Sequence, residues 1–177
     1  WHGGDKFTLD EVPDPIAEPG RVIVKVDTIG VCGTDVHITQ GLFPSTPPKV
    51  LGHEGSGVIV EVGEGVDKSR IGDRVVMNTT SHCGVCSACT TWSESRCENA
   101  DLTSGMFAEY ATAPSQSAVK IPDGLDLEQA ALTEPASCCF SGSEMMRIDE
   151  NGIGVVIGGG IMGLFTLAFL KRRGVER

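Results

Sequence analysis

The chain has 177 residues, enough for one large domain or two small ones. Lys and Arg number 14 and Asp and Glu number 24, which gives a formal net charge of −10, and hydrophobic residues make up 40 %. This composition excludes a disordered chain, and it argues against a general binder of nucleic acid or of anionic membranes, because both of those surfaces are themselves negative.

We find neither the pattern of a membrane-spanning helix nor that of a secretory signal in the sequence. No apolar run reaches the roughly 18 residues that a membrane-spanning helix needs, and the first residues lack the basic and then apolar pattern of a secretory signal. We therefore expect a cytoplasmic protein without a membrane partner. The chain begins without Met and stops in what reads as the end of a helix, so we expect it to be part of a longer protein.

Residues 1–124 are predicted to form an all-β domain. Short runs of β-branched and alternating residues predict strands over 21–27, 57–62, 71–77, 107–112 and 118–121. Gly and Pro separate these runs. Many short strands separated by Gly and Pro favour a barrel or a sandwich over βαβ units.

A metal-binding lobe is predicted within this domain, over residues 81–98. It contains four of the seven cysteines: Cys83, Cys86, Cys89 and Cys97. Thiolates at this spacing can hold one tetrahedral zinc ion. The alternative is a disulfide framework, which the odd number of cysteines and their short spacing disfavour. We therefore predict a structural zinc here and treat the neighbouring His82 as a bystander.

The pattern changes after residue 124, and residues 125–177 are predicted to begin an α/β domain. The segment 125–146 is rich in Ala, Leu, Glu and Met and is expected to be helical, with a break near Pro135 or Ser141-Gly142. A short buried strand and a further helix follow, separated by a glycine-rich turn.

This turn reads Gly158-x-Gly160-x-x-Gly163 and lies between a predicted strand at 154–157 and a predicted helix at 164–173. Glycines at this spacing allow a pyrophosphate to approach the amides at a helix N-terminus. A purely structural turn is the alternative, but the context favours a dinucleotide, NAD or NADP. The candidate cofactor-binding residues are Gly158, Gly160, Ile161, Met162 and Gly163.

Several metal-binding side chains lie near the ends of other predicted elements. Taken singly, Cys32 reads as a buried thiol, His53 as a hydrogen-bonded loop residue and Glu134 as a surface charge on a helix. Their significance comes from the motifs that surround them.

Five motifs occur together in one order. They are Cys32-Gly-Thr-Asp-x-His37, Gly52-His53-Glu54-x-x-Gly57, the four-cysteine lobe, Phe107-Ala-Glu-Tyr110 and the glycine-rich turn. In these motifs the chain resembles the zinc-dependent medium-chain dehydrogenases, the group of alcohol, sorbitol and threonine dehydrogenases. The resemblance runs from about Phe7 to Gly174.

The resemblance implies a mixed fold, in which a GroES-like all-β domain is followed by the start of a Rossmann domain. It also implies a catalytic zinc held by Cys32 and His53, with Glu54 as a ligand or exchangeable neighbour and Glu134 as a further ligand. Thr34 matches a proton relay, and His37 matches a second relay or a substrate contact.

The function implied is hydride transfer between NAD(P) and a secondary alcohol, a polyol or a hydroxy-amino acid, in a full-length homodimer or homotetramer. The rivals are a zinc-free reductase and a non-catalytic, zinc-stabilised binding module. One departure concerns Cys138 and Cys139, which follow Glu134. Adjacent helix residues point about 100° apart, so we expect both to be packing residues and not joint metal ligands.

Overall fold

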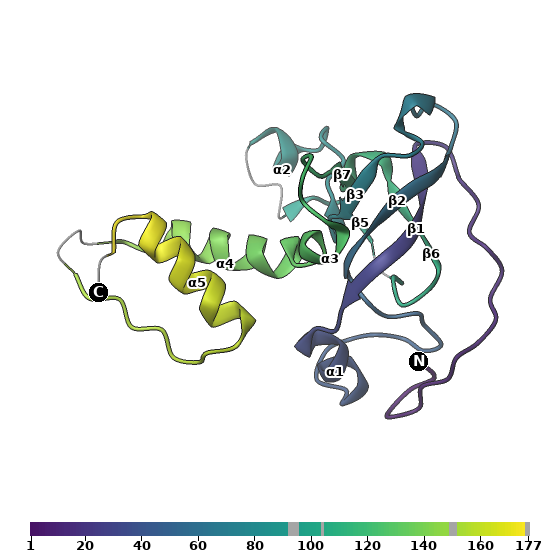
Figure 1. Cartoon of the computed structure of the whole chain (residues 1–177). Helices are drawn as coiled ribbons and strands as arrows, with labels where there is room; N and C mark the ends of the chain where they lie inside the picture. Colours follow the sequence, from purple (N-terminus) through teal and green to yellow (C-terminus); the bar gives the residue numbers. More distant parts are fainter. Residues whose placement is uncertain (92–95, 104, 149–151, 176–177) are drawn as a thin grey trace. The chain divides into compact units, whose positions relative to one another are not determined.

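A computed structural model describes residues 1–91, 96–103, 105–148 and 152–175. The chain divides into two compact units, Trp1–Ala131 and Leu132–Arg177. Among the described residues, Figure 1 shows strands in the first unit and two long helices in the second. The domain division predicted after residue 124 stays a prediction.

The first unit is built on a five-stranded antiparallel sheet with the strand order β6-β1-β2-β3-β7. Its strands are β1 (Arg21–Gly30), β2 (Glu54–Val62), β3 (Arg74–Met77), β6 (Tyr110–Pro114) and β7 (Ala118–Lys120). Each strand overlaps a range predicted from the sequence. The all-β character of this part of the chain is confirmed.

The sheet is curled, because its two edge strands are close neighbours in the chain. Strands β6 and β7 lie at opposite edges of the sheet, yet only the short 3-10 helix η3 (Ser115–Ser117) joins them. An extended chain spans about 3.5 Å per residue, so the edges must approach each other as in a barrel. Two irregularities in the pairing of β1 with β2 add local bending.

The interior of the curled sheet holds the main hydrophobic core. Alternate residues of the strands point inward, as the period of a strand requires. The buried members are Val22, Val24, Ile59, Val75, Met77, Met106, Ala111, Ala113 and Ala118. A smaller cluster joins Val76 and Ile121 to Ala130 of the short helix α3 (Leu127–Ala130). Strands β1 and β2, which lead into the cluster of candidate ligands described below, are therefore anchored in the core.

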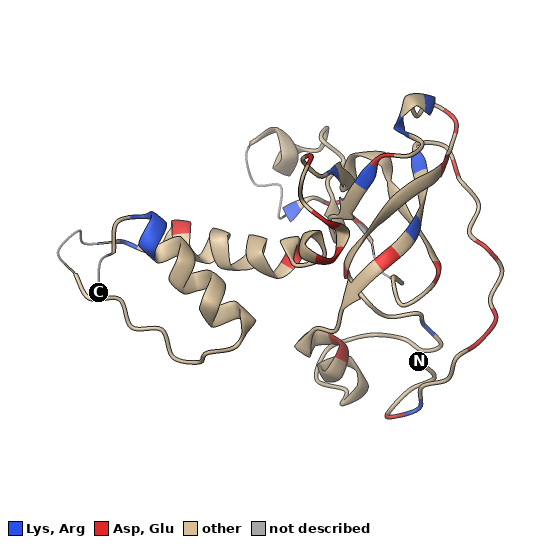
Figure 2. Ribbon diagram, in the orientation of Figure 1, with Lys and Arg blue, Asp and Glu red and all other residues tan. Residues whose placement is uncertain are grey.

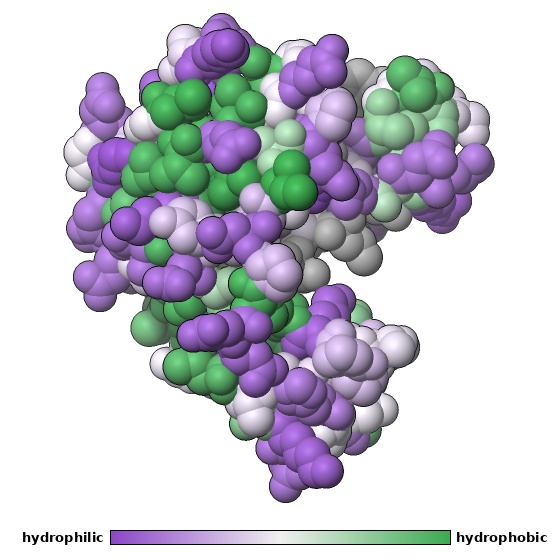
Figure 3. Space-filling view, turned by 90° about the vertical axis from the view of Figure 1, so that its right-hand side faces the viewer, coloured by the Kyte–Doolittle hydropathy of each residue, from purple (hydrophilic) through white to green (hydrophobic). Residues whose placement is uncertain are grey.

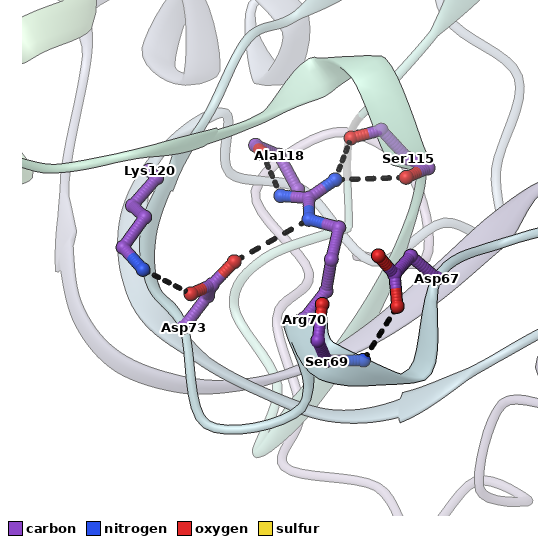
Figure 4. Close-up of polar contacts among 7 residues, drawn as sticks. All are labelled: Asp67, Ser69, Arg70, Asp73, Ser115, Ala118 and Lys120. Carbon is purple, nitrogen blue, oxygen red and sulfur yellow. Dashed lines mark hydrogen bonds and ion pairs between the residues drawn. The ribbon is translucent and has the colours of Figure 1, made fainter.

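Figure 4 shows how one arginine connects the turn before β3 to Ser115, in the segment that joins the two edge strands, and to Ala118 at the start of β7. Arg70, at the end of the 3-10 helix η1 (Lys68–Arg70), donates to the Ser115 carbonyl at 2.6 Å and to the Ala118 carbonyl at 2.5 Å. It also contacts Asp73, which Lys120 Nζ approaches to 2.6 Å. These two cations, with Lys120 the stronger, hold the pKa of Asp73 below its usual range.

The remaining elements of the first unit are short. Helix α1 (Gly33–Thr39) follows β1 and was not predicted from the sequence. The cysteine-rich lobe contains a two-stranded sheet, β4 (Thr80–Ser81) with β5 (Asp101–Leu102), and helix α2 (Ser87–Thr90). Its residues 92–95, within the predicted lobe 81–98, lie outside the described residues.

The second unit consists of helices α4 (Thr133–Met145) and α5 (Ile161–Arg172) packed on each other. The rings of Phe140 and Phe169 meet edge to face, with centroids 5.4 Å apart. Arg173 Nε lies 3.4 Å from Glu144 Oε1, and this ion pair connects the residue after α5 to the last turn of α4. Lys171 and Arg172 stand in the last turn of α5 (Figure 2), where positive charge suits the helix dipole.

The helical segment 125–146 breaks at residues 131–132, close to Pro135, which lies in the first turn of α4, where a missing N–H costs little. The alternative break at Ser141-Gly142 is wrong, because α4 continues through both residues. The expected buried strand at 154–157 is not formed among the described residues. Val155 and Ile157 are exposed instead, since no second strand is described in this unit to pair with them.

Hydrophobic residues also lie on the surface of the first unit. Residues 6–18 form no helix or strand, and they expose Phe7, Leu9 and Ile16. Figure 3 looks onto the side along which this segment runs and shows hydrophobic residues gathered in patches there. Among the described residues, no helix combines the length and the hydrophobicity needed to cross a membrane.

Candidate metal and cofactor sites

Three predicted ligands come together where β1 ends and β2 begins. Cys32, His53 and Glu54 each offer one ligand atom, and these atoms lie within 4.8 Å of one another. The antiparallel register pairs Gly30, the last residue of β1, with Glu54, the first residue of β2. This pairing brings together two segments that are more than 20 residues apart in the chain.

Cys32 is held by the start of helix α1. It is the N-cap, and its Sγ accepts a hydrogen bond from the backbone N–H of Thr34 at 3.4 Å. Its own N–H donates to Asp35 Oδ2 at 3.0 Å, which completes a capping box. The amide of Thr34 points at the sulfur and so fixes the direction of this ligand atom.

Asp35 links the cysteine to the histidine, and the sequence interpretation missed it as a site residue. It is 5 % exposed. Its Oδ1 accepts from the N–H of Gly52 at 3.2 Å and lies 3.7 Å from Nδ1 of His53. A carboxylate beside the second ring nitrogen orients a metal-binding histidine. The signal in the sequence was the Cys32-x-x-Asp35 spacing of a capping box.

Glu54 is buried against the end of β1. Its carboxylate lies so close to Gly30 that a Cβ there would overlap Glu54 Oε2. Glycine at position 30 therefore leaves room for the carboxylate. The side chain is 8 % exposed, and a buried carboxylate among metal-binding groups fits a cation. Whether Glu54 is a ligand or an exchangeable neighbour stays a prediction.

Thr34 and His37 occupy different parts of α1. Thr34 Oγ1 lies 3.6 Å from Sγ of Cys32, at the edge of the cluster. His37 is exposed in the last turn, and its carbonyl accepts from the N–H groups of Leu42 and Phe43. It does not belong to the three-residue cluster. The roles of Thr34 and His37 both stay predictions.

The four cysteines of the lobe form a second cluster. The ligand atoms of Cys83, Cys86, Cys89 and Cys97 all lie within 4.8 Å of one another. Three of the Sγ–Sγ distances are 3.5, 3.9 and 3.9 Å. Four sulfurs around one tetrahedral zinc at 2.3 Å are about 3.8 Å apart, whereas a disulfide requires about 2.0 Å. The cysteines are free, and their arrangement fits zinc.

Backbone amides inside this cluster stabilise negative sulfur. The N–H groups of Val85 and Cys86 lower the pKa of Cys83 to about 6. Burial, together with hydrogen bonds among the thiols, raises the pKa of Cys89 to about 12. The cluster thus mixes one thiol that loses its proton readily with one that keeps it, and a bound zinc ion deprotonates its thiol ligands outright.

The glycine-rich turn adopts the conformation expected before a helix N-terminus. Gly158 has φ +106°, and Gly160 is the N-cap of α5. A Cβ on Gly163 would overlap the Gly158 carbonyl. The turn is therefore tight, as a pyrophosphate-binding turn must be. Ile161 and Met162 supply the first amides of α5, and their part in cofactor binding stays a prediction.

The other predicted ligand, Glu134, lies in the first turn of α4, in the second unit. Its place in the zinc site stays a prediction.

The two cysteines that come after Glu134 in α4, Cys138 and Cys139, differ in their exposure to solvent. Cys139 is buried and its Sγ contacts the Met162 carbonyl at 3.3 Å, as expected for a packing residue. The expectation for Cys138 is wrong: it is exposed, and its Sγ lies 3.7 Å from Glu134 Oε1.

Partial desolvation of the thiol, followed by the neighbouring Glu134 carboxylate, raises the pKa of Cys138 although the residue is exposed. The thiol therefore keeps its proton more firmly than an isolated cysteine does. Its sulfur faces Glu134 and not the core, because residues four apart on a helix share a face.

Comparison with known proteins agrees with this geometry. The family described as the alcohol dehydrogenase GroES-like domain matches residues 18–123. Sorbitol dehydrogenase of Halalkalibacterium halodurans is 39 % identical over 98 % of this chain and 52 % of the relative. L-threonine 3-dehydrogenase of Pyrococcus abyssi is 36 % identical over 94 % of this chain and 50 % of the relative.

A solved structure gives the same result for the fold. The short chain alcohol dehydrogenase RspB of Escherichia coli CFT073, crystallised with NADH, superposes with a TM-score of 0.89 at 32 % identity. The match covers 99 % of this chain and 53 % of that one. The chain spans about half the length of the curated relatives it matches. The chain belongs to the zinc-type alcohol dehydrogenase family, and residues 18–123 are its GroES-like domain.

Proposed function

We propose that this chain carries the metal-binding part of a zinc- and NAD(P)-dependent dehydrogenase, whose substrate is a secondary alcohol, a polyol or a hydroxy-amino acid. The observation that carries the proposal is the cluster of Cys32, His53 and Glu54, with ligand atoms within 4.8 Å of one another. A thiolate, an imidazole and a carboxylate together are donors that suit zinc.

The chain's own residues have distinct tasks in this proposal. Cys32 and His53 hold the metal, Glu54 or Glu134 completes the ligand set, and Asp35 keeps the His53 ring oriented. When bound, zinc supplies a Lewis acid that lowers the pKa of an alcohol hydroxyl. The Thr34 hydroxyl, at the edge of the cluster, would accept the alcohol's proton at Oγ1 while its own hydroxyl proton leaves toward solvent.

The second unit supplies the first contacts for the nicotinamide cofactor, the hydride acceptor. The tight turn at Gly158, Gly160 and Gly163 leaves the first amides of α5 open to a pyrophosphate. The choice between NAD and NADP depends on a residue further along such domains. We therefore propose the cofactor class alone, and a small-molecule alcohol as the partner, in a homodimer or homotetramer of the full-length protein.

Zinc stoichiometry tests this proposal against the rival binding module. The purified chain should hold two zinc ions after dialysis, one in each cluster, and Cys32→Ser should hold one. Thr34→Val is the control, since it leaves all ligands in place and should keep two. Inductively coupled plasma mass spectrometry gives the count.

A count of one zinc in the unmodified chain, unchanged by Cys32→Ser, would favour the module. A count of zero would favour the zinc-free reductase. Circular dichroism of Cys32→Ser should match that of the unmodified chain, because the core of the curled sheet does not include Cys32.

A further inference from the structure

Residues 105–107 hold the backbone of the loop that carries His53. The carbonyl of Gly52, the residue before this histidine, accepts hydrogen bonds from the first two N–H groups of the segment, at 3.0 and 3.3 Å. The third N–H, that of Phe107, donates to the carbonyl that precedes Gly52 in the chain, at 2.9 Å. Three hydrogen bonds from a segment more than 50 residues away therefore fix the backbone directly before a candidate ligand.

Side chains of the same segment pack against the two glycines that flank His53-Glu54. A Cβ on Gly52 would lie 3.0 Å from the ring and from the backbone nitrogen of Phe107. A Cβ on Gly55, after the two ligands, would lie 2.7 Å from Sδ of Met106. The side chain of Met106 is fully buried in the core of the curled sheet. The segment is thus in close contact with the chain on both sides of the two candidate ligands.

The segment is itself anchored to the rest of the first unit. Before it, the N–H of Thr103 donates to the Thr79 carbonyl at 2.8 Å. After it, the Glu109 carbonyl accepts from the N–H of Val26 in β1 at 2.9 Å. This second anchor lies within the motif Phe107-Ala-Glu-Tyr110, to which the proposed function assigns no role. The motif therefore ties the segment to the same strand that leads to the metal cluster.

Gly105 has the backbone conformation on which the contact with Gly52 depends. Its φ is +87°, in the left-handed region that residues with a Cβ seldom adopt. A Cβ there would meet no atom closer than 3.6 Å, so the backbone angle and not a lack of space favours glycine. In this conformation the N–H groups of Gly105 and Met106 both point at the Gly52 carbonyl.

We propose that Gly105 is a positioning residue for the first cluster, formed by Cys32, His53 and Glu54. It holds the backbone from which the His53 imidazole reaches the metal, whereas Asp35 acts on the ring itself. The inference rests on the proposed function for zinc as the bound metal. A loop that is already in place loses little freedom when the metal binds, so loosening it lowers the metal affinity.

Gly105→Ala tests the proposal, because alanine strains a left-handed conformation. The matched control is Gly65→Ala. Gly65 has φ +80° and open space at its Cβ position, and it lies past the end of β2 that is opposite to Glu54. Both variants therefore introduce the same kind of strain, but only one of them introduces it next to the His53 loop.

The first measurement is amide hydrogen exchange of the metal-free chain, followed by NMR. Exchange at Gly52 should be about tenfold faster in Gly105→Ala than in Gly65→Ala, because strain of the usual size for such a residue shifts a local opening by about that factor. This measurement needs no metal. It therefore stands even where the zinc count of the proposed function fails.

The second measurement is metal affinity, with ¹¹³Cd²⁺ as the probe and NMR as the readout. The signal that Cys32→Ser loses belongs to the first cluster. A chelator should remove this signal at about tenfold lower concentration in Gly105→Ala than in Gly65→Ala, the lower end of the usual cost of losing an orienting contact. The signal of the four-cysteine lobe should be equally resistant in both variants. Gly105→Asn should recover most of the affinity, since asparagine adopts positive φ more readily than alanine.

Two results would overturn the positioning role. One is equal exchange at Gly52, or equal resistance of the first-cluster signal to the chelator, in Gly105→Ala and Gly65→Ala. The other is a parallel weakening of both metal signals in Gly105→Ala, because a general loss of stability then accounts for the effect. Faster exchange at Gly52 in Gly105→Ala, with a first cluster that stays empty in the unmodified chain, would remove the proposed function and support the positioning of the loop.

Discussion

A single buried carboxylate, Asp35, connects the two firmest candidate ligands of the first cluster. It accepts hydrogen bonds from the N–H groups of Cys32 and Gly52 and lies 3.7 Å from His53 Nδ1. Each contact fixes a residue next to or within the cluster. We therefore expect Asp35 to orient the candidate ligand atoms of Cys32 and His53, as residues behind metal ligands commonly do.

We expect Asp35→Asn to weaken zinc binding at the first cluster by about 10- to 100-fold, the usual cost of losing such a partner. An amide offers one acceptor oxygen where the carboxylate offers two, so one backbone donor loses its partner. Competition with a chelator measures the affinity. Asp67→Asn is the control, because Asp67 also caps a short helix but lies outside both clusters. Equal zinc affinity in Asp35→Asn and the unmodified chain would show that Asp35 serves the fold alone.

The candidate ligands could be predicted from residue type and spacing, whereas their supports could not. Cysteine and histidine residues in short motifs indicate metal ligands by their type and spacing alone. Asp35 did not stand out, because its role depends on the approach of residue 52 across the sheet edge. The exposure of Cys138 could not be predicted from the sequence either. The packing of α4 against α5 decides which of the two adjacent cysteines faces the neighbouring helix.

At the scale of elements, the cysteine-rich lobe is too small to be stable without a cross-link. Its strands β4 and β5 have two residues each and its helix α2 has four. Isolated helices and hairpins of this size do not persist in water. Among the described residues, Arg21 with Asp101 and Gln116 with Ser81 connect the base of the lobe to the rest of the unit. We therefore expect the four cysteines to supply the remaining constraint through a bound ion.

Cys97→Ser should remove one zinc ion per chain and expose the lobe to protease. The reason is that binding of a structural zinc, worth roughly 10–16 kcal/mol in small zinc peptides, is itself folding energy. Metal analysis and limited proteolysis with mapped cleavage sites provide the measurement. His82→Gln, a change beside the cluster that removes no thiolate, should keep both the zinc and the protection. A zinc count unaffected by Cys97→Ser would refute the structural site.

The strands were easier to predict than the small helices. The two longest strands, β1 and β2, carry several β-branched residues, which a half-buried surface selects. Helix α1 has seven residues and follows a strand directly, so its short pattern gives little periodicity to detect. The strand expected at 154–157 had the right composition, but a strand exists only through pairing, and composition says nothing of the partner.

At the scale of the whole molecule, the two units differ in how well their apolar surface is covered. The first unit closes its sheet around a core. The second unit exposes Ile153, Val155 and Ile157 beside the glycine-rich turn, and Leu164 on α5. A dinucleotide lies across two halves of a parallel sheet, at the point where the strand order reverses. The described part of the second unit offers the turn and one helix, and no strand.

We therefore expect residues 1–177 to bind zinc. We expect their affinity for NADH to be weaker than micromolar. The amides at the start of α5 can contact a pyrophosphate, yet the described residues of this unit offer no second mononucleotide half for the nicotinamide. Fluorescence titration of the purified chain with NADH measures the affinity, and 8-anilinonaphthalene-1-sulfonate binding reports the exposed apolar surface. The full-length protein is the positive control, with Gly163→Val as its matched variant, because a side chain there would meet the Gly158 carbonyl. A micromolar dissociation constant for residues 1–177, together with alcohol-dependent formation of NADH, would show that this part of the protein is functionally complete.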